Sequence, residues 1–325
     1  MQSQYSSSRR AWLQLAAGCG AALCAPLGRA APAWPARPVS LIVPFPAGGP
    51  IDTQMRALAH ALSAQGPAVV VLNQPGASGT LGPTTMARAA PDGATLAVIT
   101  TAVFRLPHLQ KVSYDPLKDF SYIVGLTSYT YAVSVPAGSR WKSLAEVVAY
   151  ARDNPGRLNV AAVGTGSLGQ IATGQWQKKA GIAVNYVPFK GGADAMAALL
   201  GGHVDVMFEA GWGAMAQAGK VRLLAVAEPG RLPGWPDVPT MAELGYDITV
   251  QSVIGIAGPR QMDAALVGRI QDAIQRATRD GNYQRALAME SMPDRFLGAR
   301  DYTDYAARQF AADRDNIREL GLALQ

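Results

Sequence analysis

The sequence predicts an α/β fold with two lobes. The chain has 325 residues, of which 49% are hydrophobic and 16% are charged, and short apolar runs alternate with segments of helical periodicity. A chain of this length exceeds the usual size of one small domain and can bury two cores. Strands that alternate with helices are typical of βαβ units and parallel sheets.

The first lobe opens with five alternating elements. Strands are expected at 39–43, 68–73 and 94–100, and helices at 53–64 and 81–90. Each expected strand is a short apolar run, and the helix at 53–64 carries apolar residues at helical spacing. We expect these elements to form βαβ units of one sheet.

A second alternating series follows. Ser143 and Glu146 have the spacing of a capping box and predict the start of a helix that runs to 154. Further strands are expected at 158–163, 184–189, 204–208 and 221–226, and further helices at 170–180 and 193–200.

The order of these elements predicts how the chain is divided. Extended segments near 126–136 and 250–258 are expected to cross between the lobes, and helices from Asp263 onward are expected to return to the first lobe. Lobe 1 therefore comprises 37–130 together with 251–325, and lobe 2 comprises the inserted 131–250.

Residues 1–33 are predicted to be an export signal outside the fold. An arginine pair, Arg9 and Arg10, precedes an apolar run, and small residues follow in a cleavage region near 30–33. The pair is similar to a twin-arginine signal, but Trp12 replaces the more usual Phe, so Sec export stays open.

Composition excludes several classes of function. Both cysteines, Cys19 and Cys24, lie in the predicted signal, so the mature chain is expected to have no disulfide, thiolate metal site or cysteine nucleophile. The net charge of +6 is scattered and not gathered in a basic groove, which argues against a nucleic-acid partner. We expect no metal and no cofactor.

The stretch VPFPAGGPID, residues 43–52, places two glycines where an expected strand gives way to a helix. Bare N–H groups at the start of a helix attract anions. A tight turn that needs glycine torsions is the alternative. Similar glycine turns follow other expected strands, at 73–80, 164–169 and 189–194. Because ligands collect beyond the carboxyl ends of strands in α/β sheets, we expect these turns to line a cleft.

The turn at 164–169 is a literal G-x-G-x-x-G. A dinucleotide site also needs an acidic residue after the next strand, but that strand ends in Val187-Pro188-Phe189-Lys190. The motif therefore predicts exposed N–H groups and not a nicotinamide cofactor.

The sequence contains no recognisable combination of catalytic residues. Ser167 lacks the first glycine of a nucleophile elbow, and His60, His108 and His203 have no metal-ligand spacing. Asp205 and Glu209 flank a strand and are candidates for polar groups in the cleft; their spacing does not define an acid–base pair.

Several stretches together resemble a known family. They are RPVSLIVPFPAGGPID, VLNQPGASGTLGP, AAPDGATLAVIT, SYDPLKDFSYI, VPFKGGADAMAALLGGHVDVMF, AGKVRLLAVA and RLPGWPDVPTMAELGY. Between Pro38 and about Gly258 the chain is similar to the extracytoplasmic solute receptors of tripartite tricarboxylate transporters, also called Bug or TctC receptors. The resemblance implies a two-lobe periplasmic-binding-protein fold, type II-like, with two mixed sheets flanked by helices and joined by two crossing strands.

The resemblance also implies a site in which two loops grip one carboxylate. The loop residues that it points to are Phe45, Ala47, Gly48, Gly49, Asp52, Gly164, Gly166 and Ser167. Asp52 is expected to cap its helix and not to touch the ligand. Further candidate ligand contacts lie on the other turns: Gly76, Ser78, Thr101, Lys190, Gly191, Glu209 and Trp212.

The chain departs from the family where ligand choice is usually made. Leu168 and Gly169 follow Ser167 in place of further small hydroxyl residues, and Glu209 and Trp212 follow the strand that ends at Phe208. Trp212 is expected to add an aromatic wall, and Glu209 to hold water or an amine of the ligand. The ligand class that remains is a small organic anion: a di- or tricarboxylate, an acidic amino acid or an aromatic acid.

These features predict a monomeric, non-enzymatic periplasmic receptor that delivers its ligand to membrane permease subunits. A ligand-sensing module for a partner such as a sensor kinase is the first alternative. A hydrolase that uses Ser167 in the same cleft is the second, and it would need a base within hydrogen-bond reach of that hydroxyl.

Overall fold

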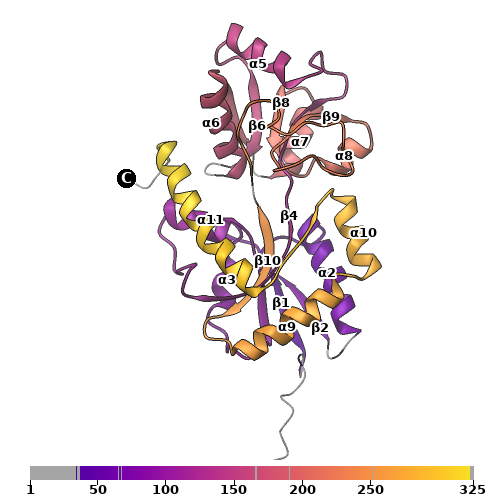
Figure 1. Cartoon of the computed structure of the whole chain (residues 1–325), viewed down its shortest axis with the longest axis vertical. Coiled ribbons are helices and arrows are strands. Elements are labelled where there is room, and N and C mark those ends of the chain that lie inside the picture. Colours follow the sequence, from indigo (N-terminus) through magenta and orange to yellow (C-terminus); the bar gives the residue numbers. More distant parts are fainter. Residues whose placement is uncertain are drawn as a thin grey trace, which may run out of the picture. The chain divides into compact units, whose positions relative to one another are not determined.

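The computed structural model describes residues 34, 37–64, 66, 68–164, 167–189, 191–250 and 252–322. The predicted export signal, residues 1–33, lies outside the described residues. The remainder, Trp34–Gln325, forms one compact unit built on two sheets, and its elements are labelled in Figure 1.

The larger sheet has six strands in the order β11-β4-β10-β3-β1-β2. They are β1 (Val39–Val43), β2 (Val69–Asn73), β3 (Thr95–Ile99), β4 (Phe120–Ser128), β10 (Val253–Pro259) and β11 (Asp294–Leu297). β1 is parallel to both β2 and β3, whereas β10 is antiparallel to β3 and β4, and β11 is antiparallel to β4. The sheet with its helices is lobe 1.

The smaller sheet has five strands in the order β7-β6-β8-β5-β9 and forms the core of lobe 2. They are β5 (Ala132–Pro136), β6 (Asn159–Val163), β7 (Asn185–Phe189), β8 (Val206–Glu209) and β9 (Val221–Val226). β6 is parallel to β7 and β8, and β5 is antiparallel to β8 and β9. Both sheets are therefore mixed, as the resemblance implied.

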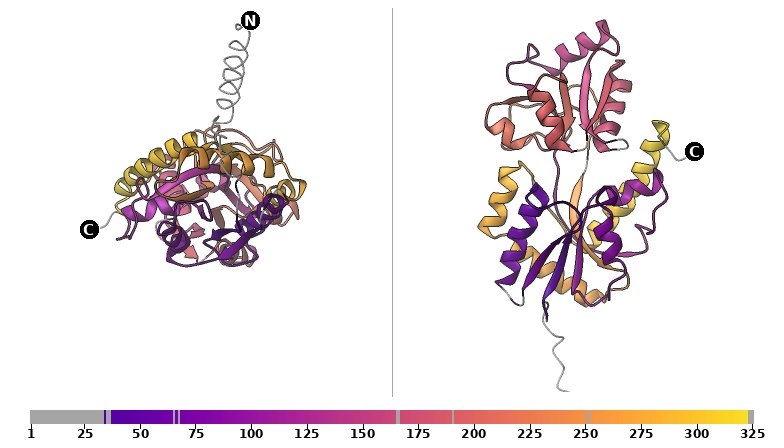
Figure 2. Two further views of the ribbon diagram at one scale, coloured as in Figure 1. Left: turned by 90° about the horizontal axis from the view of Figure 1, so that it is seen from below. Right: turned by 180° about the vertical axis from the view of Figure 1, so that it is seen from behind.

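Helices cover both faces of the larger sheet (Figures 1 and 2). Side chains alternate along the strands, so that Leu41 and Val98 pack on one face and Ile42 and Ile99 on the other. The first face is covered by α2 (Pro50–Ser63), α9 (Ala264–Ala277) and α10 (Gly281–Met289), and the second by α3 (Leu81–Met86), α4 (Ala102–Arg105) and α11 (Ala299–Glu319).

The smaller sheet is covered in the same way. Val160 and Phe208 pack on one face and Ala161 and Met207 on the other. The first face is covered by α5 (Leu144–Asp153) and α6 (Leu168–Ala180), and the second by α7 (Gly192–Leu200) and α8 (Gly213–Gln217). Two 3₁₀ turns, Ala77–Gly79 and Leu106–His108, complete the elements that the sections below use.

The predicted strands and helices are present with several shifted boundaries, whereas α4, α8 and β11 were not predicted. The Ser143 hydroxyl accepts a hydrogen bond from the Glu146 amide at 3.3 Å, which confirms the cap of α5. The extended segment expected at 126–136 is two strands of different sheets, because pairing stops between Ser128 and Ala132. The predicted lobe boundaries, between residues 130 and 131 and between residues 250 and 251, stay a prediction.

No helix within the described ranges has the length and apolar character needed to span a membrane.

Candidate functional site

The loop that opens the predicted site ends at Gly49, the N-cap of α2. The helix begins at Pro50, earlier than the expected start at residue 53. Asp52 therefore lies in the first turn and not at the cap position, and its carboxylate reaches back to accept the Gly48 amide at 2.8 Å. Gly48 has φ +86°, a torsion that favours glycine. The expectation that Gly48 offers its N–H to a ligand is corrected, because Asp52 already accepts it.

Asp52 is 2% exposed and also ties this loop to the next strand. It accepts hydrogen bonds from Arg56 at 2.9 Å and Asn73 at 2.7 Å, and Asn73 donates at 3.0 Å to the Phe45 carbonyl. Burial raises the pKa of Asp52, but the donors from Arg56, Gly48 and Asn73 outweigh it and hold the pKa below its usual value. Asp52 therefore stays ionised, and its hydrogen bonds hold the loop before α2 in place. The sequence reasoning assigned no role to Arg56 or Asn73.

The second loop of lobe 1 has an unusual backbone. Gly76, Ala77, Ser78 and Gly79 all have positive φ, at 138°, 46°, 53° and 88°. For alanine and serine this conformation costs about 1–2 kcal/mol per residue. Such strain persists where the surroundings enforce it, and it gathers at binding sites.

The loops of lobe 1 converge at the carboxyl ends of β1, β2 and β3. A Cβ atom built on Gly79 would lie 3.3 Å from the Phe45 ring and 3.9 Å from the Thr100 hydroxyl. The predicted residue Thr101 is 4% exposed and begins α4. Phe45, Gly76, Ser78 and Thr101 are therefore on one edge of the sheet, as expected for parallel strands.

The loops of lobe 2 converge in the same manner. Gly164, with φ +56°, donates its N–H to the Phe189 carbonyl at 2.8 Å, and its carbonyl accepts the Tyr186 hydroxyl at 2.6 Å. Gly191 is the N-cap of α7 and has an extended backbone. Two further predicted contacts, Gly166 and Lys190, lie outside the described residues.

Ser167 is the N-cap of α6. Its hydroxyl accepts the Gln170 amide at 3.0 Å and donates to the Tyr186 oxygen, whose own proton is bonded to the Gly164 carbonyl. Burial raises the pKa of Tyr186 to about 12, so this phenol is no base at neutral pH. His108 bonds the Phe310 carbonyl at 3.0 Å in lobe 1, and no hydrogen bond to Ser167 is found for it among the described residues. The structure thus assigns Ser167 a capping role.

Glu209 ends β8 and is 4% exposed. Its two oxygens accept the amides of Val163 and Ala210, each at 3.0 Å, and Tyr131 supplies a further hydrogen bond. Burial raises the pKa of Glu209, and these donors oppose the shift. Glu209 therefore holds the ends of β6 and β8 together. These hydrogen bonds account for a buried acid at this position without a bond to the ligand.

Trp212 is 1% exposed, which corrects its expected role as an aromatic wall of the site. The ring packs edge-on against Trp235, with centroids 5.7 Å apart, inside the core of lobe 2. Its indole N–H donates at 2.9 Å to the Thr130 carbonyl, which lies between β4 and β5. Trp212 thus joins the start of α8 to a crossing segment.

Arg105, the last residue of α4, was missed by the sequence reasoning. Its Nε and Nη1 atoms are buried and have no hydrogen-bond partner among the described residues. Its charge acts on Tyr131 and Glu209 of lobe 2 as well as on Tyr114 of lobe 1. An effect across the lobes indicates that the segment after β3 in lobe 1 lies near the end of β8 in lobe 2.

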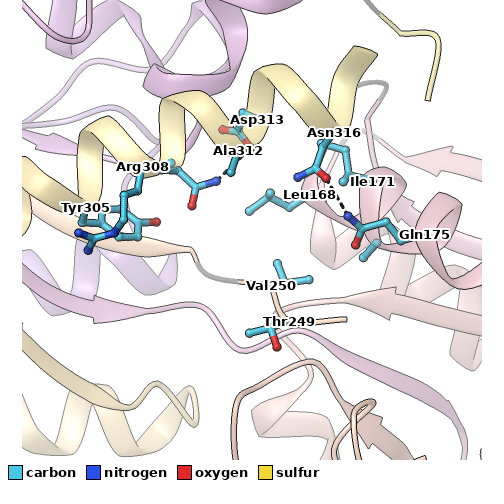
Figure 3. Close-up of a pocket in the computed structure, with 12 residues that line it drawn as sticks. Leu168, Ile171, Gln175, Thr249, Val250, Tyr305, Arg308, Ala312, Asp313 and Asn316 are labelled. Carbon is cyan, nitrogen blue, oxygen red and sulfur yellow. Dashed lines mark hydrogen bonds between the residues drawn. The ribbon is translucent and has the colours of Figure 1, made fainter. Parts of the chain in front are cut away.

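A partly open pocket of about 290 Å³ lies between α6, α11 and Thr249–Val250 (Figure 3). It contains none of the predicted site residues. Its polar side chains are largely engaged: Gln175 donates to Asn316 at 2.9 Å, and Gln309 to Asp313 at 3.0 Å. The lining includes both the buried acid Asp313 and the cation Arg308. The described residues contain no group of three or more His, Cys, Asp or Glu side chains that could hold a metal.

Comparisons with known proteins agree with the geometry. Residues 54–322 match the model of the Tripartite tricarboxylate transporter family receptor. The UPF0065 protein in the gbd 5′ region of Cupriavidus necator is 36% identical over 292 residues, which are 89% of each chain. Protein BugT of Bordetella pertussis is 31% identical over 317 residues, 94% of this chain and 95% of its own length.

Solved structures give the same result. MatC from Rhodopseudomonas palustris, with bound malate, has a TM-score of 0.73 and 28% identity over 87% of this chain and 100% of its own. A second R. palustris protein, with adipate, has a TM-score of 0.79 and 26% identity over 89% of this chain and 99% of its own. The resemblance seen in the sequence is confirmed: this chain belongs to the tripartite tricarboxylate transporter receptor family, which consists of solute receptors and not of enzymes.

Proposed function

We propose that this chain is a periplasmic receptor that binds a small organic carboxylate between the loops of lobe 1 and lobe 2. Family membership supports receptor function, and two similar structures hold malate and adipate. The candidate contacts on lobe 1 are Phe45, Ala47, Gly49, Gly76, Ser78 and Thr101, and those on lobe 2 are Gly164, Gly166, Ser167, Lys190 and Gly191.

One observation carries the proposal: one helix of each lobe, α2 and α7, begins at these loops without a side-chain cap. Gly49 and Gly191, the N-caps of α2 and α7, provide no side-chain cap. The amides of a first helical turn have no carbonyl partner within the helix, and the helix dipole adds a partial positive charge there. Backbone N–H groups of this kind bind carboxylates without an arginine.

We further propose that the bound ligand is handed to the permease subunits of a tripartite tricarboxylate transporter, and that residues 1–33 export the chain to the periplasm by the Sec or the twin-arginine route. The receptor acts as a monomer in this proposal. The family supports the transport role over the sensing role, because its model describes a transporter receptor.

Gly49→Val tests the site. Gly49 has φ −77° and ψ 168°, which valine adopts freely, and a new Cβ would meet only the Pro46 carbonyl at 3.8 Å. The variant should fold normally, yet its side chain should block the approach of a carboxylate to the start of α2. A thermal-shift screen of small carboxylates should find acids that raise the Tm of the wild type, and these shifts should largely disappear in Gly49→Val.

Gly138→Val is the matched control. Gly138 lies in an exposed turn after β5, with nothing within 4 Å of a new Cβ. It should keep the wild-type response. A wild type that no acid stabilises, or equal responses of the two variants, would contradict the proposed site.

A further inference from the structure

The pocket between α6, α11 and Thr249–Val250 is partly open and lies outside the loops proposed to hold the ligand (Figure 3). α6 belongs to lobe 2 and α11 to lobe 1, so an occupant would touch both lobes. The volume of about 290 Å³ exceeds the ~150 Å³ of an apolar cavity that holds one benzene molecule. The pocket therefore has room for one small ring with a substituent.

Much of the lining is apolar. Leu168, Ile171 and Ala172 contribute from α6, Val250 contributes from the segment before β10, and Ala312 adds a small exposed side chain from α11. Contact with these side chains removes apolar surface of an occupant from water, which favours an apolar body. A rigid ring suits this space better than a flexible chain, because it loses less conformational freedom on binding.

Arg308 supplies the accessible charge of the pocket. It is an exposed residue of α11 and lies beside Tyr305 at one end of the pocket (Figure 3), where its charge acts on the tyrosine hydroxyl. No ion pair within 4 Å joins Arg308 to an acid of the described residues. Asp313, the acid of the lining, is 0% exposed; Arg105 attracts its charge, and Gln309 donates to it at 3.0 Å. A solvent-borne ligand therefore meets the cation and not the acid.

We propose that this pocket is a second binding site, which takes a small aromatic carboxylate with its ring between α6 and α11 and its carboxylate on Arg308. A guanidinium offers a planar pair of N–H donors that matches a carboxylate in geometry. Gln175 and Asn316, also in the lining, are bonded to each other at 2.9 Å, which leaves the arginine as the group that orients the ligand. The site shares no residue with the loops of the proposed function and does not depend on it.

Isothermal titration of the full mature protein with three probes tests the chemistry of the site. Phenylacetate carries both the ring and the charge, phenylacetamide keeps the ring without the charge, and acetate keeps the charge without the ring. Phenylacetate should bind roughly tenfold more tightly than either of the others, the effect of one charge-assisted hydrogen-bonded pair or of one buried ring.

Four variants locate the binding. Ala312→Phe places a ring in the pocket from an exposed position of α11 and should abolish the binding of phenylacetate, whereas Ala307→Phe, exposed on the same helix and outside the lining, should not. Arg308→Gln should weaken phenylacetate by roughly tenfold and leave phenylacetamide unchanged. Arg318→Gln removes another exposed arginine of α11 outside the lining and should match the wild type. Thermal unfolding of each variant confirms that the protein titrated is folded.

The titration is repeated in Gly49→Val to separate this pocket from the proposed carboxylate site. Phenylacetate should bind that variant as it binds the wild type. Binding that is lost in Gly49→Val and kept in Ala312→Phe would place phenylacetate at the start of α2, which overturns the second site and supports the proposed function. A wild type that binds phenylacetate no more tightly than acetate or phenylacetamide also overturns the second site, and leaves the proposed function to the thermal-shift screen.

Discussion

Asp52 and Glu209 perform the same task in two different sheets. Each is an almost fully buried acid that accepts backbone amides of a glycine-containing loop or a strand end. Each therefore fixes the backbone that the ligand meets, without needing to meet the ligand. A carboxylate suits this task because one group can accept several N–H donors.

Asp52→Asn should destabilise the protein by about 1–3 kcal/mol, the usual cost of disrupting buried hydrogen bonds to a charged group. The asparagine loses the ion pair with Arg56, and its NH₂ group faces the donors of Gly48 or Asn73. Urea unfolding would measure the change. Asp153→Asn, at an exposed position near the end of α5, should change stability by no more than about 0.5 kcal/mol. Equal effects of the two substitutions would refute the fastening role of Asp52.

Sequence reasoning succeeded at the residues whose partners are near them in the chain. The Ser143 cap and the glycine of positive φ at 48 follow from local spacing and turn chemistry. Arg105 was missed because its neighbours, Tyr131, Glu209 and Asp313, come from far along the chain and from both lobes. Trp212 was misjudged because an aromatic residue after a strand can point into either the cleft or the core.

At the scale of elements, close packing of α6 explains the third glycine of the 164–169 motif. A Cβ atom on Gly169 would lie 2.5 Å from the Glu209 carboxylate, 2.7 Å from the Ala162 Cβ and 2.9 Å from the Phe208 carbonyl. The glycine therefore lets α6 approach β6 and β8, and no dinucleotide is required to explain it. The start of α6 is held at the end of the sheet by this contact.

Gly169→Ala should therefore destabilise the protein by about 1–3 kcal/mol, the usual cost of overpacking, because two of the three contacts cannot rotate away. Gly268→Ala is the control, since this glycine lies within α9 with open space around it. The control should raise stability by up to about 1 kcal/mol through helix propensity. Chemical unfolding of both variants distinguishes packing from propensity. A stabilising Gly169→Ala would show that α6 does not pack as described.

The strands that sequence predicted well are short apolar runs buried on both faces, such as β1 and β3. β11 was not expected, because Asp294–Leu297 is short, polar at its start and half-buried. The break between β4 and β5 was not expected either, since the apolar pattern continues from one sheet into the other. The pattern of apolar residues in the sequence indicates which residues are buried. It does not indicate with which sheet a strand pairs.

At the scale of the whole molecule, polar contacts join the two lobes at more than one place. Arg295 of β11 forms an ion pair with Glu228, which follows β9 and is 2% exposed. On another flank, Gln175 and Lys178 of α6 bond to Asn316 and Glu319 of α11. A movement of one lobe against the other would have to preserve or break these bonds.

Glu228 makes stability depend on pH. Burial raises its pKa to about 7, although Arg295 opposes the shift. The folded state therefore keeps a proton that the unfolded chain releases near its ordinary pKa of about 4.5. The contribution to stability is full below that value and is lost as the pH rises through about 7.

Thermal unfolding between pH 5 and pH 8 tests this dependence. The Tm of the wild type should fall with rising pH relative to that of Glu228→Gln, whose side chain cannot ionise. Some slope should remain in the variant, because the pKa of buried Asp313 is also raised by burial, to about 6. Parallel curves for the two proteins would show that Glu228 is ionised to the same extent in both states.

The bond from the Trp212 indole to the Thr130 carbonyl gives the protein an optical reporter of its own. The indole is sealed in lobe 2, and its one polar atom is bonded to the segment that links β4 with β5. Rotation about that segment changes the dipole that this chromophore experiences. In a variant whose other tryptophans are replaced by phenylalanine, a shift in its emission spectrum on ligand addition would report a change at this bond without any added dye.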